Sequence, residues 1–215
     1  MPRRAALPPK RVDPQQKPFR EGLSWQTGSS ASLPDEVVRF RRRAILVARL
    51  LRDELAVTGS AVPRDLAALL DLVRDARHVV ELGTAAGWTA LSVALVNPAC
   101  RVLTLDDTHK KRRHAYSILV PKDVRSRVEF RTERAELGCG AIRDVDVLFV
   151  DVGWHSLEET RDPFLAWEPA VRTGGTVVFH DYRRPDFPGV AAAIDELGLT
   201  GELHGGSLFV WRKPG

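Results

Sequence analysis

Arg77-His78-Val79-Val80-Glu81-Leu82-Gly83-Thr84-Ala85-Ala86-Gly87-Trp88 is the most informative segment of this 215-residue chain. It predicts an apolar strand that ends beside an acidic residue, followed by a tight turn and a helix over residues 88–96. Glycine tolerates a positive φ, and its missing Cβ leaves space for a ligand against the backbone. Free N–H groups at the start of the helix point toward that space. The segment therefore predicts a ligand-binding turn at the end of a strand.

A second strand is predicted directly after this unit. Residues 101–105 are largely apolar and lead into Asp106 and Asp107. A carboxylate at that place accepts hydrogen bonds from two ribose hydroxyls, which is the usual second half of a nucleoside site. We therefore expect Asp106 to bind the ribose of a nucleoside-containing cofactor.

Two cofactors compete for this pair of strands. A nicotinamide site requires G-x-G-x-x-G with its pyrophosphate on the helix N-terminus, and the glycine spacing here is shorter. Glu81 would also repel a pyrophosphate, whereas it suits the ammonium and sulfonium groups of S-adenosylmethionine. The turn resembles motif I of the class I methyltransferases, with Ala85 where many members carry the middle glycine. That resemblance implies S-adenosylmethionine as cofactor, contacted by Glu81, Gly83, Thr84 and Gly87.

The amino-acid composition excludes several classes of protein. Hydrophobic residues make up 44% of the chain, which is enough for a sizeable core. No apolar run approaches the roughly 20 residues that span a bilayer, so no membrane partner is expected. The two cysteines, Cys100 and Cys139, lack metal-ligand spacing and are too few for a disulfide scaffold. We expect a reduced, cytoplasmic protein.

Residues 1–34 are predicted to form a basic, flexible tail. The first twenty residues contain six basic side chains and only one acid, and the whole chain has a net charge of +4. Such a tail is compatible with nucleic-acid binding and equally with solubility alone. Residues 35–75 are predicted to form a helical cap, with one helix from Pro34-Asp35-Glu36 to Thr58-Gly59-Ser60 and a second near 63–74. The stripe Val37, Val38, Leu46, Leu50 and Leu51 is expected to face the core, and the two helices to form a lid or a homodimer surface.

From residue 76 to 215, predicted strands and helices alternate, which is typical of a parallel sheet covered on both faces. We expect strands at 78–82, 101–105, 128–131, 145–150 and 176–180, and helices at 88–96, 110–119, 156–172 and 188–197, with a poorly defined slot at 133–143. Residues 201–212 predict a closing hairpin through Gly205-Gly206. Five parallel strands and a hairpin form the seven-stranded α/β, Rossmann-like sheet of the class I methyltransferases.

Ligands of such sheets bind beyond the carboxyl ends of the strands. The third strand ends near Glu133, and the resemblance implies that this residue contacts the adenine amino group. The fourth strand ends at Asp151 and the fifth at His180-Asp181. Ser156 and Glu159 form a capping box, so a helix is expected to begin there with His155 at its mouth. Two carboxylates beside two histidines can hold a divalent cation or relay a proton.

This half of the chain resembles a bacterial O-methyltransferase family with Asp-Gly-Asp-His-Ser-Tyr-Glu after strand four and Leu-His-Asp after strand five. The residues that carry the likeness are Asp151, His155, Ser156, Glu159, His180 and Asp181. The chain departs from the pattern by one inserted residue before His155 and by Trp154, where an acidic residue is common. The resemblance implies His155 and Asp151 as catalytic residues, with Asp151 also near the cofactor. It implies a Mg²⁺ site formed by Asp151, Asp181 and His180.

The expected function is S-adenosylmethionine-dependent O-methylation of a small hydroxylated molecule. An RNA-directed methyltransferase is the alternative, although the Asn/Asp-Pro-Pro-aromatic motif of enzymes that methylate nucleobase amines is replaced by Asp151-Val152-Gly153-Trp154. A non-catalytic binding module with the same fold is the other alternative.

Overall fold

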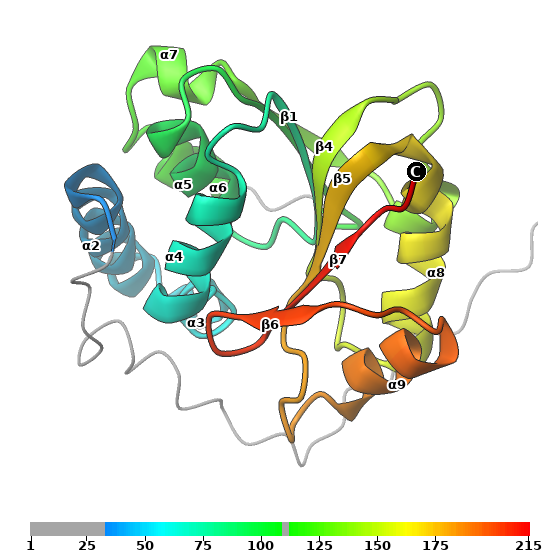
Figure 1. Ribbon diagram of the computed structural model, residues 1–215. Coiled ribbons are helices and arrows are strands. Elements are labelled where there is room, and N and C mark those ends of the chain that lie inside the picture. Colours follow the sequence, from blue (N-terminus) through cyan, green and yellow to red (C-terminus); the bar gives the residue numbers. More distant parts are fainter. Residues whose placement is uncertain (1–32, 109–111) are drawn as a thin grey trace, which may run out of the picture.

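The computed structural model describes residues 33–108 and 112–215, and it consists of one sheet with helices on both faces (Figure 1). The predicted tail at 1–34 lies almost entirely outside the described residues. The sheet has seven strands in the order β3-β2-β1-β4-β5-β7-β6. All neighbours are parallel except those of β7, which runs antiparallel to β5 and β6. The predicted fold is confirmed.

The strands follow the predicted positions closely. Their bounds are β1 His78–Leu82, β2 Arg101–Asp106, β3 Val128–Thr132, β4 Val145–Val150, β5 Val171–Phe179, β6 Glu202–His204 and β7 Leu208–Arg212. β1 and β4 lie at the centre of the sheet, and β4 is almost fully buried because helices cover both of its faces. β5 begins earlier than predicted, since Val171 already pairs with Val145 and a register shift follows.

The helices lie in two layers. Their bounds are α2 Asp35–Leu50, α3 Glu54–Thr58, α4 Pro63–Leu72, α5 Trp88–Val96, α6 Arg113–Ser117, α7 Lys122–Arg125, α8 Leu157–Trp167 and α9 Pro188–Glu196. α2 to α7 cover one face of the sheet, and α8 and α9 cover the other (Figure 1). Short 3₁₀ turns at Ala135–Leu137 and Glu168–Ala170 pack against α8.

The prediction of one long first helix was wrong. The helix ends at Leu50, Arg52 adopts a φ of 52°, and the Asp53 side chain accepts a hydrogen bond from the Ala56 N–H to begin α3. The predicted apolar stripe was also wrong in part, because the buried face of α2 is a different helical stripe. That stripe consists of Val37, Phe40, Arg41, Ala44, Ile45 and Ala48, while Leu46, Leu50 and Leu51 are exposed.

Three further helical segments differ from the predictions. The segment at 110–119 forms the short α6, and Pro121 then opens α7. The segment at 133–143 contains only a 3₁₀ turn, whose Ala135 carbonyl accepts a hydrogen bond from the Trp167 indole. α8 ends at Trp167, because Glu168 and Pro169 turn the chain directly into β5.

Gly83 joins the ligand-binding turn to the neighbouring strand β4. The Asp151 N–H donates to the Leu82 carbonyl, which draws the end of β4 against the turn. Gly83 has a φ of 104°, and a Cβ there would overlap the Asp151 carbonyl oxygen. A Cβ at Gly87 would instead meet the Phe130 ring at 2.6 Å. Both glycines are thus required by chain packing, whereas the sequence suggested only that they leave room for a ligand.

We expect Gly83→Ala to lower the free energy of unfolding by about 3 kcal/mol, because it adds a steric overlap to an unfavourable φ. Urea unfolding followed by circular dichroism measures the change. Gly198→Ala is the matched control, since Gly198 has a φ of 63° and a Cβ there would meet no atom within 4 Å. Equal losses in the two variants would show that the overlap with Asp151 contributes nothing.

Candidate active site

A small cleft lies over the turn between β1 and α5. The turn residues Gly83, Thr84, Ala85 and Ala86 form one wall, with Glu81 and Asp151 at the strand ends. Ala56, Gly59 and Ser60, from the end of α3 and the residues after it, form part of the opposite side. The helical cap therefore contributes directly to the cleft. Four of the residues predicted from sequence, Glu81, Gly83, Thr84 and Asp151, line it.

Glu81 is a buried carboxylate in this cleft. The Thr104 hydroxyl donates a hydrogen bond of 2.5 Å to Glu81 Oε2, and Thr104 also lies 2.7 Å from the Thr84 hydroxyl. Burial disfavours the charged form and outweighs the hydrogen bond from Thr104, so the pKa of Glu81 is raised to about 8. A cationic ligand would stabilise the charged form of this group.

Asp106 lies at the end of β2, beside the turn, and its carboxylate is held firmly. Asp106 Oδ2 accepts a hydrogen bond from the Ala85 N–H and lies 2.7 Å from Arg113 Nη2, while Oδ1 accepts from the Thr108 N–H. Arg113 also donates from Nε to the Ala85 carbonyl. Sequence reasoning missed Arg113, because nothing in the pattern of α6 distinguishes it from the surrounding surface cations.

Two further residues predicted from the sequence, Glu133 and Gly87, lie outside the lining of the cleft. The Glu133 N–H donates to the backbone carbonyl of Asp106, so Glu133 follows directly on the end of β3 beside the predicted ribose-binding residue. The Glu133 side chain is half-buried. Gly87 caps α5 with a φ of 80°. Neither residue lines the described cleft.

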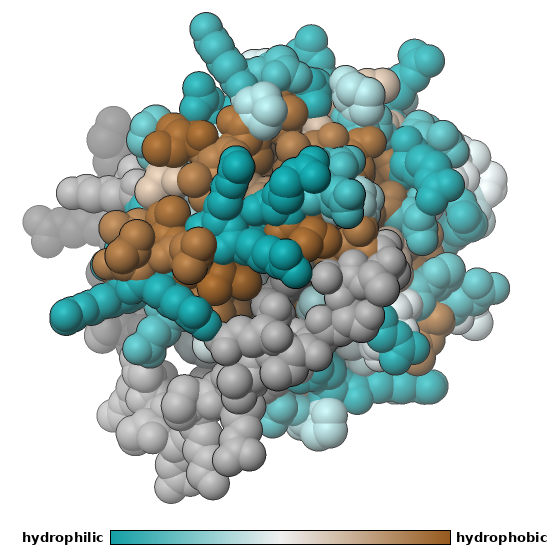
Figure 2. All heavy atoms as spheres, turned by 90° about the vertical axis from the view of Figure 1, so that its left-hand side faces the viewer, coloured by the Kyte–Doolittle hydropathy of each residue, from teal (hydrophilic) through white to brown (hydrophobic). Residues whose placement is uncertain are grey.

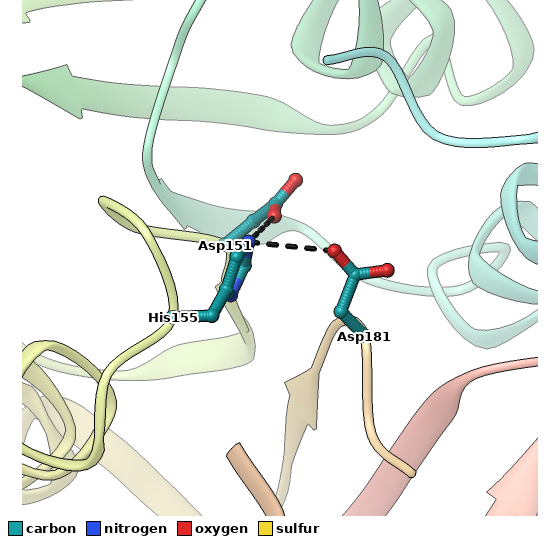
Figure 3. Close-up of side chains that lie close together, drawn as sticks. All are labelled: Asp151, His155 and Asp181. Carbon is teal, nitrogen blue, oxygen red and sulfur yellow. Dashed lines mark ion pairs between the residues drawn. The ribbon is translucent and has the colours of Figure 1, made fainter. Parts of the chain in front are cut away.

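A second group, Asp151, His155 and Asp181, lies at the ends of β4 and β5 (Figure 3). His155 Nε2 is 3.4 Å from Asp151 Oδ1 and 3.4 Å from Asp181 Oδ2, so the imidazole points between the two carboxylates. One ligand atom from each residue lies within 4.8 Å of the others, which is close enough to hold a single metal ion. Because Asp151 also lines the cleft, this group adjoins it.

The backbone holds two members of this group in an unusual conformation. His155 has a φ of 57° and Asp181 a φ of 59°, a region that costs non-glycine residues about 1 kcal/mol or more each. The predicted capping box is present, with Ser156 accepting from the Glu159 N–H. Glu159 also accepts a hydrogen bond from the Trp154 N–H, and this bond fixes the loop that contains the inserted residue. His155 is thereby directed into the group, and the Trp154 side chain stays 59% exposed.

His180 lies beside this group and is fully enclosed by carboxylates. Its Nδ1 is 3.0 Å from Asp151 Oδ1, and its Nε2 is 3.8 Å from Asp65 Oδ2. Burial alone would lower the pKa of His180, but the charges of Asp151 and Asp181 outweigh it and raise the pKa to about 10. Among the described residues, the group with metal-binding geometry contains His155, and His180 is not part of it.

Asp65 connects the helical cap to this site and was not predicted. It is 2% exposed in the first turn of α4, and it accepts hydrogen bonds from the N–H groups of Gly206 and Ser207 and from the Ser207 hydroxyl. In the sequence, Asp65 reads as an ordinary acidic residue near a helix N-terminus. Only the folded arrangement, in which the final hairpin meets α4, brings it to His180.

Comparison with known proteins identifies the domain. Residues 80–182 match the model of a methyltransferase domain family. No curated protein matches the chain.

Solved structures share the fold. The O-methyltransferase TomG of Streptomyces achromogenes, which is involved in tomaymycin synthesis and was solved with S-adenosylmethionine, is 19% identical with a TM-score of 0.59, over 85% of this chain and 91% of TomG. A methyltransferase of Geobacter sulfurreducens is 18% identical with a TM-score of 0.62, over 85% and 91% of the two chains. An S-adenosylmethionine-dependent O-methyltransferase of Thermotoga maritima is 14% identical with a TM-score of 0.56, over 85% of this chain and 72% of the Thermotoga protein.

We expect Asp65→Ala to lower the free energy of unfolding by about 3–5 kcal/mol, because it leaves the buried donors of Ser207 and Gly206 without an acceptor and removes one of the carboxylates around His180. Chemical unfolding with native-state spectroscopy measures the loss. Asp71→Ala on the same helix is the control, since Asp71 pairs only with Arg74 at the surface and should change stability by about 0.5 kcal/mol or less. A similar, small effect of both substitutions would contradict a structural role for Asp65.

Proposed function

We propose that the chain, which is a class I methyltransferase by its matched domain and its strand order, transfers the methyl group of S-adenosylmethionine to a hydroxyl oxygen of a small molecule. The observation that supports this reaction is the position of the Asp151–His155–Asp181 group beside the cleft over the β1–α5 turn. The turn provides a nucleoside site, and the group provides the acid–base or metal chemistry that a hydroxyl acceptor needs.

The residues that line the cleft suit S-adenosylmethionine in their chemistry, and this cofactor would supply the methyl group when bound. Glu81 is a buried carboxylate suited to the cationic part of this cofactor, and burial is the main cause of its raised pKa. Asp106 accepts hydrogen bonds from the ribose hydroxyls while Arg113 holds its carboxylate in place. Gly83 and Thr84 line the cleft, and Gly87 caps the start of α5. Glu133, which follows β3, would contact the adenine if the nucleoside extends past Asp106.

Asp151, His155 and Asp181 fit a divalent cation, because their ligand atoms converge. Such an ion would lower the pKa of the acceptor hydroxyl. Mg²⁺ suits the two carboxylates, and the imidazole adds affinity for a transition ion such as Mn²⁺. His180 is an unsuitable ligand, because both of its ring nitrogens already face carboxylates, those of Asp151 and Asp65. Without a metal ion, His155 is the base that removes the hydroxyl proton, and Asp151 and Asp181 orient it.

The geometry favours an enzyme over a non-catalytic module. A binding module has no need for two carboxylates and a histidine in strained backbone conformations beside a cofactor cleft. A small acceptor is favoured over RNA, because α3 and the residues after it contribute to the cleft and narrow the access to it.

We expect cofactor binding to release protons near pH 7, because Glu81 is mainly protonated in the free protein and ionises beside a cation. The pKa of Glu81 in the folded protein is raised from 4.5 to about 8. The folded state therefore favours protonated Glu81, and the free energy of unfolding falls as pH rises from 4.5 to 8. Calorimetry with S-adenosylmethionine in two buffers of different ionisation enthalpy measures the release. Glu81→Gln should abolish it, and buffer-independent heats for the native chain would contradict the role of Glu81.

The reaction is tested by transfer of a labelled methyl group to a panel of hydroxylated metabolites and to RNA, with EDTA and after adding back Mg²⁺ or Mn²⁺. We expect methylation of a small hydroxylated acceptor, lost in EDTA and restored by metal. Asp181→Asn should lower kcat by about 100-fold or more, because it removes a ligand of the ion. Asp186→Asn is the control, since Asp186 is exposed outside the group. Transfer to RNA alone would overturn the acceptor class, and activity indifferent to EDTA would leave His155 as the base.

A further inference from the structure

The outer side of the helical cap has an unusual surface, which we call the α2–α3 face. It consists of Arg39, Arg42, Arg43, Leu46, Arg49, Leu50, Leu51, Arg52 and Leu55. Along α2 the exposed positions follow the spacing i, i+3, i+4, i+7, i+10 and i+11 from Arg39 to Leu50, so they form one continuous stripe. The stripe lies opposite the buried face that packs on the domain.

Large apolar side chains are exposed on this face. Leu50 is 84% exposed, Leu46 59% and Leu55 52%. Figure 2, which views the side of the molecule that carries α2, shows apolar side chains with hydrophilic ones projecting between them. Single exposed leucines are ordinary, but neighbouring ones along one stripe indicate a surface that contacts an apolar phase or partner.

From Arg39 to Arg52 the charge of the face has one sign, and the exposed acidic residues Glu36 and Glu54 lie at its two ends. The sequence from Arg39 to Arg52 contains no acidic residue. Among the residues that the structure describes, none of the five arginines of the face forms an ion pair, although Asp53 next to them pairs with Arg112 and Tyr116. The adjoining sequence 1–32 contains six further basic residues against two acidic ones. Positive charge is therefore concentrated at the end of the chain that carries the exposed leucines.

We propose that the α2–α3 face docks on an anionic lipid surface, with the leucines entering the outer acyl region and the arginines contacting lipid phosphates. Binding to a membrane interface combines burial of apolar side chains with attraction of basic side chains to anionic lipids, and this face carries exposed side chains of both kinds. Each basic residue near such a surface adds to the attraction. This docking needs no membrane-spanning segment, and none of the helices in the described parts of the chain is long and apolar enough to span a membrane. It departs from the expectation of no membrane partner, which considered only spanning segments.

Other occupants fit the face less well. Nucleic acid would use the arginines but would leave the leucines in water, because phosphates offer no apolar contact. A second copy of the chain would bring the arginine stripe close to itself around a two-fold axis, and these like charges repel. Both remain measurable outcomes of the same experiment.

Flotation of the full chain with vesicles tests the proposal. We expect binding to phosphatidylglycerol vesicles, at least about tenfold weaker binding to phosphatidylcholine, and weakening as salt rises from about 0.05 M to about 0.5 M. The pair Arg42→Gln and Arg43→Gln should weaken binding by roughly tenfold or more. The pair Leu46→Glu and Leu50→Glu should weaken it at least as much, because it removes the apolar contact as well.

Leu165→Glu is the matched control, because Leu165 is 54% exposed on α8, on the other side of the sheet. It should leave vesicle binding unchanged, and circular dichroism confirms that all variants are folded. Equal binding to both vesicle types, or no binding to either, overturns the proposal. Leucine variants that bind vesicles like the native chain would also overturn it. A second copy would be the occupant if vesicle binding is absent and the leucine variants convert a dimer to a monomer in light scattering. Nucleic acid would be the occupant if only RNA binds and this binding depends on the arginines.

Discussion

The close approach of Gly83 to Asp151 is the constraint on which the site depends. The backbone of the β1–α5 turn lies against the end of β4 with no room for a side chain between them. This contact places the floor of the cofactor cleft and the first carboxylate of the Asp151–His155–Asp181 group in one rigid unit. Because methyl transfer requires the acceptor oxygen to be held in line with the methyl carbon, a fixed distance between these two regions is a precondition of catalysis.

The backbone around the second carboxylate contributes to this rigidity in a different way. His155 and Asp181 adopt positive φ values that they would avoid in a flexible loop. The capping box of Ser156 and Glu159 and the pairing of β4 with β5 hold them in place. The stability lost to these conformations is offset by the buried sheet. The group is therefore ordered before any ligand binds, which is the arrangement that favours catalysis.

Much of this site could be predicted from the sequence, because the ends of neighbouring parallel strands always meet at the same edge of a sheet. Glu81, Asp106, Asp151 and Asp181 follow from that rule alone. The rule does not predict side chains that reach this edge of the sheet from helices. Asp65 and Arg113 come from helices, and local sequence does not show which face of a short helix is buried. The break at Arg52 was missed for the same reason, since Leu50 and Leu51 suggested a continuous apolar stripe.

The contact of Asp65 with Ser207 joins residues that are 142 positions apart. The carboxylate next to His180 therefore reaches its final partners only when the last strand of the chain has been added to the sheet. During synthesis on the ribosome, the cap, β1 and β4 emerge well before this strand. The contact of Asp65 with Ser207 forms only after the C-terminal hairpin has emerged. A prematurely terminated chain would therefore lack the hairpin residues that bind Asp65 beside His180.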